Sequence, residues 1–202
     1  MQNLWRVFFV LCGIGILAGG PLHPGGTMAE MLAHPDWFRS HALMLAGFVA
    51  LVIGLALYGQ RTALPAGTRR WLRAALAGSM LQSIEMAFHT AAMIDHDKLV
   101  AGAPTPVLST HLWLTALFYP VFAVTTAGFI VSGARERVLG SWWIAWLGIA
   151  GGLAHGAAGP LVVIWEVEWA RELFPLIVLF ALWCVLAACW PARASGVSSP
   201  SH

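Results

Sequence analysis

The sequence predicts an all-α, polytopic integral membrane bundle of about six transmembrane helices, and three observations lead to this fold class. First, 59% of the 202 residues are apolar and only 10% are charged, whereas soluble domains have roughly 25% charged residues. Second, apolar stretches recur at about the 20 residues that cross a hydrocarbon core. Third, these stretches lack the alternation of barrel strands, and lipid otherwise permits only helices as spanning structures.

The charge balance and the cysteines narrow the function classes. A formal net charge of +2 excludes a strongly basic nucleic-acid-binding protein, so we expect no nucleic-acid partner. Cys12, Cys184 and Cys189 lie in apolar stretches without CxxC spacing, which supports neither a disulfide framework nor a zinc ribbon. Because the polar segments between the apolar stretches are short, we expect one bundle over residues 1–191 that carries the function itself.

Six apolar stretches are the candidate spans, and they cover residues 4–20, 37–59, 71–93, 107–132, 142–165 and 173–191. The first could instead be a signal peptide, because Arg6 precedes an apolar run that ends in small residues. In both interpretations residues 21–36 lie outside. There, Thr27 and Glu30 have the spacing of a capping box, which predicts a short amphipathic surface helix at about 27–34. The tail 192–202, rich in Ser and Pro, is predicted to be a disordered cytoplasmic segment.

The basic residues between the spans predict the orientation of the bundle. Eight lie on one side and three on the other, and the positive-inside rule makes the larger group cytoplasmic. Both termini are then inside, in a multi-pass protein of the inner (plasma) membrane that has the lipid bilayer as its first partner. The larger group is Arg6, Arg61, Arg69, Arg70, Arg73, Arg135, Arg137 and Arg193, and the smaller is Arg39, Lys98 and Arg171.

Histidines stand at corresponding positions in the second to fifth spans. His41 and His111 each follow a hydroxyl residue near the start of their spans, and His89 and His155 precede small residues in the spans that come next. The two histidines of a pair are 48 and 44 residues apart. This pattern predicts that spans 2–3 and 4–5 form a parallel internal repeat. All four histidines then lie in the outer half of the bundle.

The third span carries a polar stripe at helical spacing. Its members Gln82, Glu85, His89, Met93 and His96 share one face of a helix, so this face should point into the bundle. Charged side chains typically cost about 2.5–3.5 kcal/mol at the bilayer centre, so an intramembrane carboxylate marks a function by default. The alternative is that Glu85 pairs with a histidine or serves as a neutral structural hydrogen-bond donor.

The histidines favour a haem or copper site used for redox chemistry or metal handling. Imidazole is the commonest protein ligand of transition metals, and haem iron is often held by histidine. For any one of these histidines alone, an interhelical hydrogen bond is the competing interpretation. Glu85 would then act as a hydrogen-bonding partner of a ligand or as a proton relay. The predicted ligands, with a thioether that suits copper, are His41, His89, His111, His155 and Met93.

Two other function classes fit the same residues. A metal-free membrane enzyme acting on a lipid, sterol or isoprenoid would use Glu85 and His89 as its catalytic acid and base. A transporter would carry protons on the intramembrane Glu and His residues. Five glycines near His155, namely Gly148, Gly151, Gly152, Gly156 and Gly159, allow either close helix packing or room for a flat group. That group would be a porphyrin, or the ring of a quinone or isoprenoid ligand.

Reporter fusions test the predicted orientation. Because of the eight-to-three charge distribution, reporters fused at 61–70 and 133–140 should lie in the cytoplasm, and reporters at 94–104 should lie outside. A cytoplasmic reporter at 94–104 would invert the bundle and place the four histidines in its inner half.

Overall fold

A computed structural model describes residues 3–61 and 64–191, and over these ranges the chain is helical, without a strand. The predicted all-α class is therefore confirmed for this part of the chain, whereas the tail 192–202 lies outside the described residues. The long helices are α1 (Leu4–Gly19), α3 (Asp36–Gly59), α4 (Ala66–Ala91), α6 (Pro106–Arg135), α7 (Trp142–Val163) and α8 (Ile177–Cys189). Shorter elements are η1 (Gly20–Leu22), α2 (Met28–Ala33), η2 (Ala92–Asp95), α5 (His96–Val100) and η3 (Glu168–Leu176).

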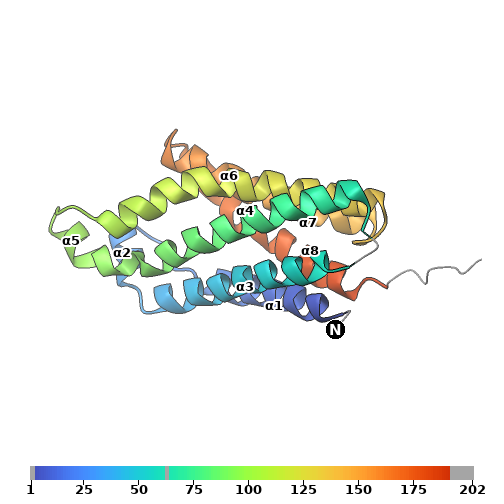
Figure 1. The fold of residues 1–202 in the computed structure, drawn as a ribbon. Helices are drawn as coiled ribbons and strands as arrows, with labels where there is room; N and C mark the ends of the chain where they lie inside the picture. The colour runs from blue at the N-terminus through green and yellow to red at the C-terminus, as the bar shows by residue number, and fades with distance from the viewer. Residues whose placement is uncertain (1–2, 62–63, 192–202) are drawn as a thin grey trace, which may run out of the picture.

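The long helices form a closed ring in which each packs against two neighbours. α1 packs against α3 and α8, α4 packs against α3 and α6, and α7 packs against α6 and α8. Inside the ring, Phe122 contacts Phe48 and Phe180, with ring centroids 5.6 and 5.2 Å apart. Figure 1 shows α2 and α5 at one end of the bundle and the N-terminus at the other. We call the first of these the α2/α5 end.

Five helical segments are long and apolar enough to cross a membrane by length and composition. They are Leu4–Leu22, Asp36–Gly59, Pro106–Arg135, Trp142–Val163 and Glu168–Cys189. These segments make the chain a multi-pass membrane protein. α4 is not among them although it has 26 residues, because it carries arginines in its first turns and buries Ser79, Gln82 and Glu85. The sixth span and the internal repeat remain predictions.

α1 is an integral part of the core. Phe9 and Ile16 are buried in the main hydrophobic cluster, and α1 lies so close to α3 that a Cβ on Gly15 would be 2.7 Å from the carbonyl oxygen of Leu43. The thiols of Cys12 and Cys184 lie 3.8 Å apart between α1 and α8, and both cysteines are free. Together these contacts join the first helix to the last.

α2 covers the α2/α5 end and starts at the expected capping box. Glu30 Oε2 accepts a hydrogen bond of 2.7 Å from the Thr27 backbone N–H, and Thr27 Oγ1 accepts one from the Glu30 N–H. The hydrogen bonds that Oε2 accepts from the backbone N–H and the hydroxyl of Thr27 hold the pKa of Glu30 below its usual value. A second hydrophobic cluster packs beneath α2 and consists of Leu32, Trp37, Ala92 and Leu108.

Asp95 connects the end of α4 to the start of α6. Its Oδ2 accepts hydrogen bonds from the backbone N–H groups of Val107 (2.6 Å) and Leu108 (3.0 Å), and its Oδ1 accepts one from Lys98 Nζ (2.9 Å). Burial alone would raise the pKa of this carboxyl, but the hydrogen bonds outweigh it and lower the pKa. The ionised carboxylate therefore satisfies free N–H groups of α6 and fixes its first turn against η2.

Glycines bring α7 close to α6 and α8. A Cβ on Gly156 would lie 2.2 Å from the Cβ of Ala123, and a Cβ on Gly151 would lie 2.5 Å from the backbone nitrogen of Phe180. Neighbouring helices thus occupy the space beside these glycines, as the packing interpretation predicts. By contrast, a Cβ on Gly152 would meet no atom closer than 3.7 Å.

Alanine substitutions in α7 test this packing. Gly156→Ala should lower the free energy of unfolding by about 1–3 kcal/mol, because the added methyl group must push α6 away. Gly152→Ala is the matched control and should be neutral or slightly stabilising, since its Cβ fits and alanine favours helix. Thermal unfolding in detergent measures the difference. Equal midpoints for the two variants would contradict the close α6–α7 contact.

Candidate metal centre

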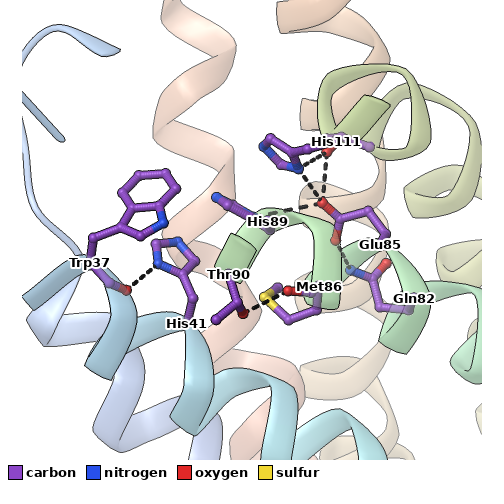
Figure 2. Close-up of polar contacts among 9 residues, drawn as sticks. Trp37, His41, Gln82, Glu85, Met86, His89, Thr90 and His111 are labelled. Atoms are coloured by element: carbon purple, nitrogen blue, oxygen red, sulfur yellow. Dashed lines mark hydrogen bonds and ion pairs between the residues drawn. The ribbon is translucent and has the colours of Figure 1, made fainter. Parts of the chain in front are cut away.

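A cluster of imidazoles around one carboxylate lies within the α2/α5 end of the bundle. His23 belongs to the loop after η1, His41 to α3, Glu85 and His89 to α4, and His111 to α6. Figure 2 shows His89 between His41 on one side and Glu85 on the other. Four segments that are distant in sequence therefore contribute to one polar cluster inside an otherwise apolar bundle.

Glu85 is fully buried, and neighbouring side chains satisfy its carboxylate. Oε1 accepts hydrogen bonds from His111 Nδ1 and Thr115 Oγ1, both at 2.8 Å. Oε2 accepts one from Gln82 Nε2 at 3.1 Å (Figure 2). His89, one turn along the same helix, has its Nδ1 3.6 Å from Oε1, which is beyond hydrogen-bond distance. The hydrogen-bonded histidine partner of Glu85 is thus His111 of α6.

Four imidazole rings follow one another from the protein surface to Glu85. His111 stacks on His89 with ring centroids 3.9 Å apart. His89 in turn lies 4.1 Å from His41, and His41 lies 4.9 Å from His23. His23 is exposed, whereas His41 and His111 are buried. The row of four rings therefore connects the solvent-exposed His23 to Glu85, which is fully buried.

Backbone carbonyl groups fix the tautomers of the two histidines nearest the surface. His41 Nδ1 lies 2.6 Å from the carbonyl oxygen of Trp37, and His23 Nδ1 lies 2.9 Å from that of Pro24. Since a carbonyl oxygen only accepts, both Nδ1 atoms must carry the proton, which leaves each Nε2 with a free lone pair. Desolvation by its neighbours lowers the pKa of His23 and favours this neutral form.

Two buried ring nitrogens in the cluster have no hydrogen-bond partner. They are Nε2 of His41 and Nδ1 of His89. A buried polar atom without a partner costs free energy, so these two positions call for an explanation. An imidazole with one nitrogen free and the other donating to an oxygen is the usual arrangement of a metal-ligating histidine.

Two groups of three donors have the spacing that could hold a metal ion. One is His23, His41 and His89, which we call the three-histidine site. The other is Glu85, His89 and His111, which we call the carboxylate site. In each group, one ligand atom per residue lies within 4.8 Å of the others. His89 belongs to both groups, so it is the central residue of the cluster.

Of the four histidines predicted as ligands, the structure brings three together, and His155 joins neither group. The His155 ring stacks on Tyr119 with centroids 4.4 Å apart, and its Nδ1 lies 3.4 Å from the carbonyl oxygen of Phe174. α7 packs against α6 and α8 and not against α3 or α4. Its histidine therefore contacts α6 at Tyr119.

Met93 lies on the outside of the bundle. It is 38% exposed and lines an apolar groove with Phe38, Leu45 and Ile94. Met93 belongs to η2, so it lies beyond the α-helical periodicity of α4 on which the predicted stripe was based. The polar stripe ends at His89, and His96 pairs with Asp97 at 2.9 Å.

The ligand set predicted from the sequence does not include His23. Helical periodicity relates residues on one element, and His23 lies in an irregular loop between η1 and α2. Its only sequence signal is its position directly after the first span, on the same side as the other histidines. Thr115 and Tyr119 were also missed, although both follow His111 at four-residue intervals on α6.

Comparison of the chain with protein-family models, with curated proteins and with solved structures gives no match. The class of the protein therefore rests on the geometry described above. It is a multi-pass helical bundle with a His/Glu cluster that could hold a metal ion.

Proposed function

We propose that this protein binds a divalent transition-metal ion at the three-histidine site, with copper as the ion bound most tightly. The observation that carries the proposal is the pair of fixed tautomers, which leaves Nε2 of His23 and of His41 free beside the ring of His89. Three histidines with one open position form a known ligand set for metals that exchange a fourth ligand. In our proposal the site faces the periplasm or the extracellular side.

The donor set favours Cu²⁺ over other ions and over cuprous copper. Imidazole nitrogens suit Zn²⁺, Cu²⁺, Fe²⁺ and Ni²⁺, and among first-row divalent ions Cu²⁺ binds such ligands most strongly. Cuprous copper prefers thioether and thiolate ligands. Met93 was the thioether we predicted, but it lines the external groove instead.

The stacked rings favour a bare ion over haem. The centroids of His41, His89 and His111 are only 4.1 and 3.9 Å apart along the row, which is van der Waals contact. A haem held between two of these histidines would need space for its porphyrin between the two rings, but the rings are in contact. The residues present therefore fit a metal ion and do not fit haem.

Glu85 acts on the three-histidine site through His89. Oε1 of Glu85 lies 3.6 Å from Nδ1 of His89, so its negative charge favours the tautomer that carries the proton on Nδ1 and leaves Nε2 for the ion. A carboxylate behind a histidine makes the ring a better ligand. The bonds from Gln82 and Thr115 keep the carboxylate in place. In this arrangement Glu85 positions a ligand of the three-histidine site without binding the ion there.

One observation favours a second candidate, a metal-free acid–base site. The 2.8 Å bond between Glu85 and His111 already forms a buried proton-sharing pair. Such a pair serves a membrane enzyme acting on a lipid, sterol or isoprenoid, or a proton-coupled transporter. An apolar groove between α3 and α4, lined by Phe38, Leu45 and Met93, would suit a lipid-like substrate. Metal binding decides between the two candidates.

Metal titration of the protein purified in mild detergent tests the primary proposal. We expect wild-type protein to bind Cu²⁺, and His89→Ala to weaken binding tenfold or more, because His89 is common to both donor groups. His34→Ala is the matched control, since His34 is a partly exposed histidine outside the cluster. His155→Ala should also retain binding. A wild-type protein that binds no Cu²⁺ would leave the acid–base candidate.

Glu85→Gln tests the role of the carboxylate. The substitution preserves shape and hydrogen-bonding capacity but removes the charge that orients His89, so Cu²⁺ should still bind at saturation with about 10–100-fold lower affinity. Expression should stay near normal, and activity in a functional assay should be lost or strongly reduced. If the variant unfolds and also loses its metal, Glu85 is a structural residue or a ligand. An unchanged affinity would remove Glu85 from the site.

A further inference from the structure

We propose that the carboxylate site is a second, deeper metal station, and that one ion passes between it and the three-histidine site through His89. This proposal rests on the proposed function. It extends that function from a single binding site to a two-step path that leads from the surface into the bundle.

The carboxylate site has the donors and the burial of a metal station. Two imidazoles and one carboxylate are the ligand set of catalytic zinc sites and of non-haem iron sites. Glu85 and His111 are 0% and 4% exposed, so an ion held there is shielded from solvent. The Nδ1 atom of His89 on this side has no hydrogen-bond partner, so an ion that binds there displaces no hydrogen bond of this residue.

His89 presents different nitrogens to the two stations. Its Nδ1 faces Glu85 (Figure 2), and its Nε2 lies on the opposite edge of the ring, on the side of the three-histidine site. A neutral imidazole has one lone-pair nitrogen at a time. His89 therefore serves one ion at a time, and transfer of the ion accompanies transfer of the ring proton from Nδ1 to Nε2.

Binding at the carboxylate site also rearranges one proton of His111. Its Nδ1–H now donates to Glu85 Oε1, so an ion that binds Nδ1 requires this proton to move to Nε2 of the same ring. The proton moves within the His111 ring and leaves neither the ring nor the site. The step thus exchanges the hydrogen bond between His111 and Glu85 for metal–ligand bonds and releases no proton from the site.

Charge gives the path a direction. The three-histidine site offers only neutral ligands, whereas the carboxylate site adds one negative charge. In a buried environment of low dielectric constant the attraction between a dication and a carboxylate is strong. The exposed station therefore captures the ion, and the buried station retains it.

Copper titration with electron paramagnetic resonance (EPR) tests the two stations in the full-length protein. Wild-type protein should bind one Cu²⁺ per chain, with the spectrum of two nitrogen ligands and oxygen. The double variant His23→Ala/His41→Ala should also bind one Cu²⁺ with that spectrum, because it keeps the carboxylate site. His111→Gln should bind one Cu²⁺ with three nitrogen ligands, because it keeps only the three-histidine site.

The outcomes separate this proposal from the proposed function. Two Cu²⁺ per wild-type chain would overturn the shared use of His89. If wild type and His111→Gln bind Cu²⁺ but the double variant binds none, the deeper station is wrong and the three-histidine site stands. If wild type binds none, the proposed function itself fails. Should the double variant not fold, His23→Ala replaces it, because this variant leaves only His41 and His89 at the three-histidine site. Bound Cu²⁺ with the spectrum of two nitrogen ligands and oxygen then supports the deeper station, and loss of that spectrum overturns it.

Discussion

The hydrogen bonding of Glu85 is the constraint on which the polar half of this bundle depends. A carboxylate with no exposed surface must be satisfied by the protein, since neither lipid nor core can replace water. Its three hydrogen bonds come from α4 and α6, so these two helices must meet in one register. That register stacks His111 on His89.

α4 shows how such a helix is accommodated in a membrane protein. Its composition falls short of a spanning helix because it buries polar side chains, yet it occupies a full position in the ring between α3 and α6. The polar face turns toward α6, where Glu85 accepts hydrogen bonds from His111 and Thr115. α4 therefore differs from the five apolar segments, which meet the requirement for a membrane span by length and composition.

Much of the fold could be predicted from the sequence because it follows from local rules. Apolar length marks the five spanning segments, the Thr27–Glu30 spacing marks α2, and helical spacing places Gln82 and Glu85 on one buried face. The candidate site was predicted only in part. Periodicity failed for Met93, where the helix changes to a tighter winding, and it cannot address a loop residue such as His23.

The position of His155 shows a further limit of pattern comparison. The similarity between the two pairs of spans predicts equivalent roles for corresponding histidines, but contacts in a ring depend on which helices are neighbours. His89 lies on α4, between helices that both carry a histidine of the cluster. The histidine of α7 instead meets an aromatic side chain, Tyr119. Corresponding histidines thus have different surroundings because their helices have different neighbours in the ring.

The closure of the ring between α1 and α8 bears on how the protein is made. Ribosomes deliver the helices in order, and α1 gains its second neighbour only after α8, the last helix, has been inserted. All donors of both stations lie between residues 23 and 111, so the chain contains the whole set once the start of α6 has been synthesised. The donor set can therefore assemble during translation, while the bundle is still open on the side that α7 and α8 later cover.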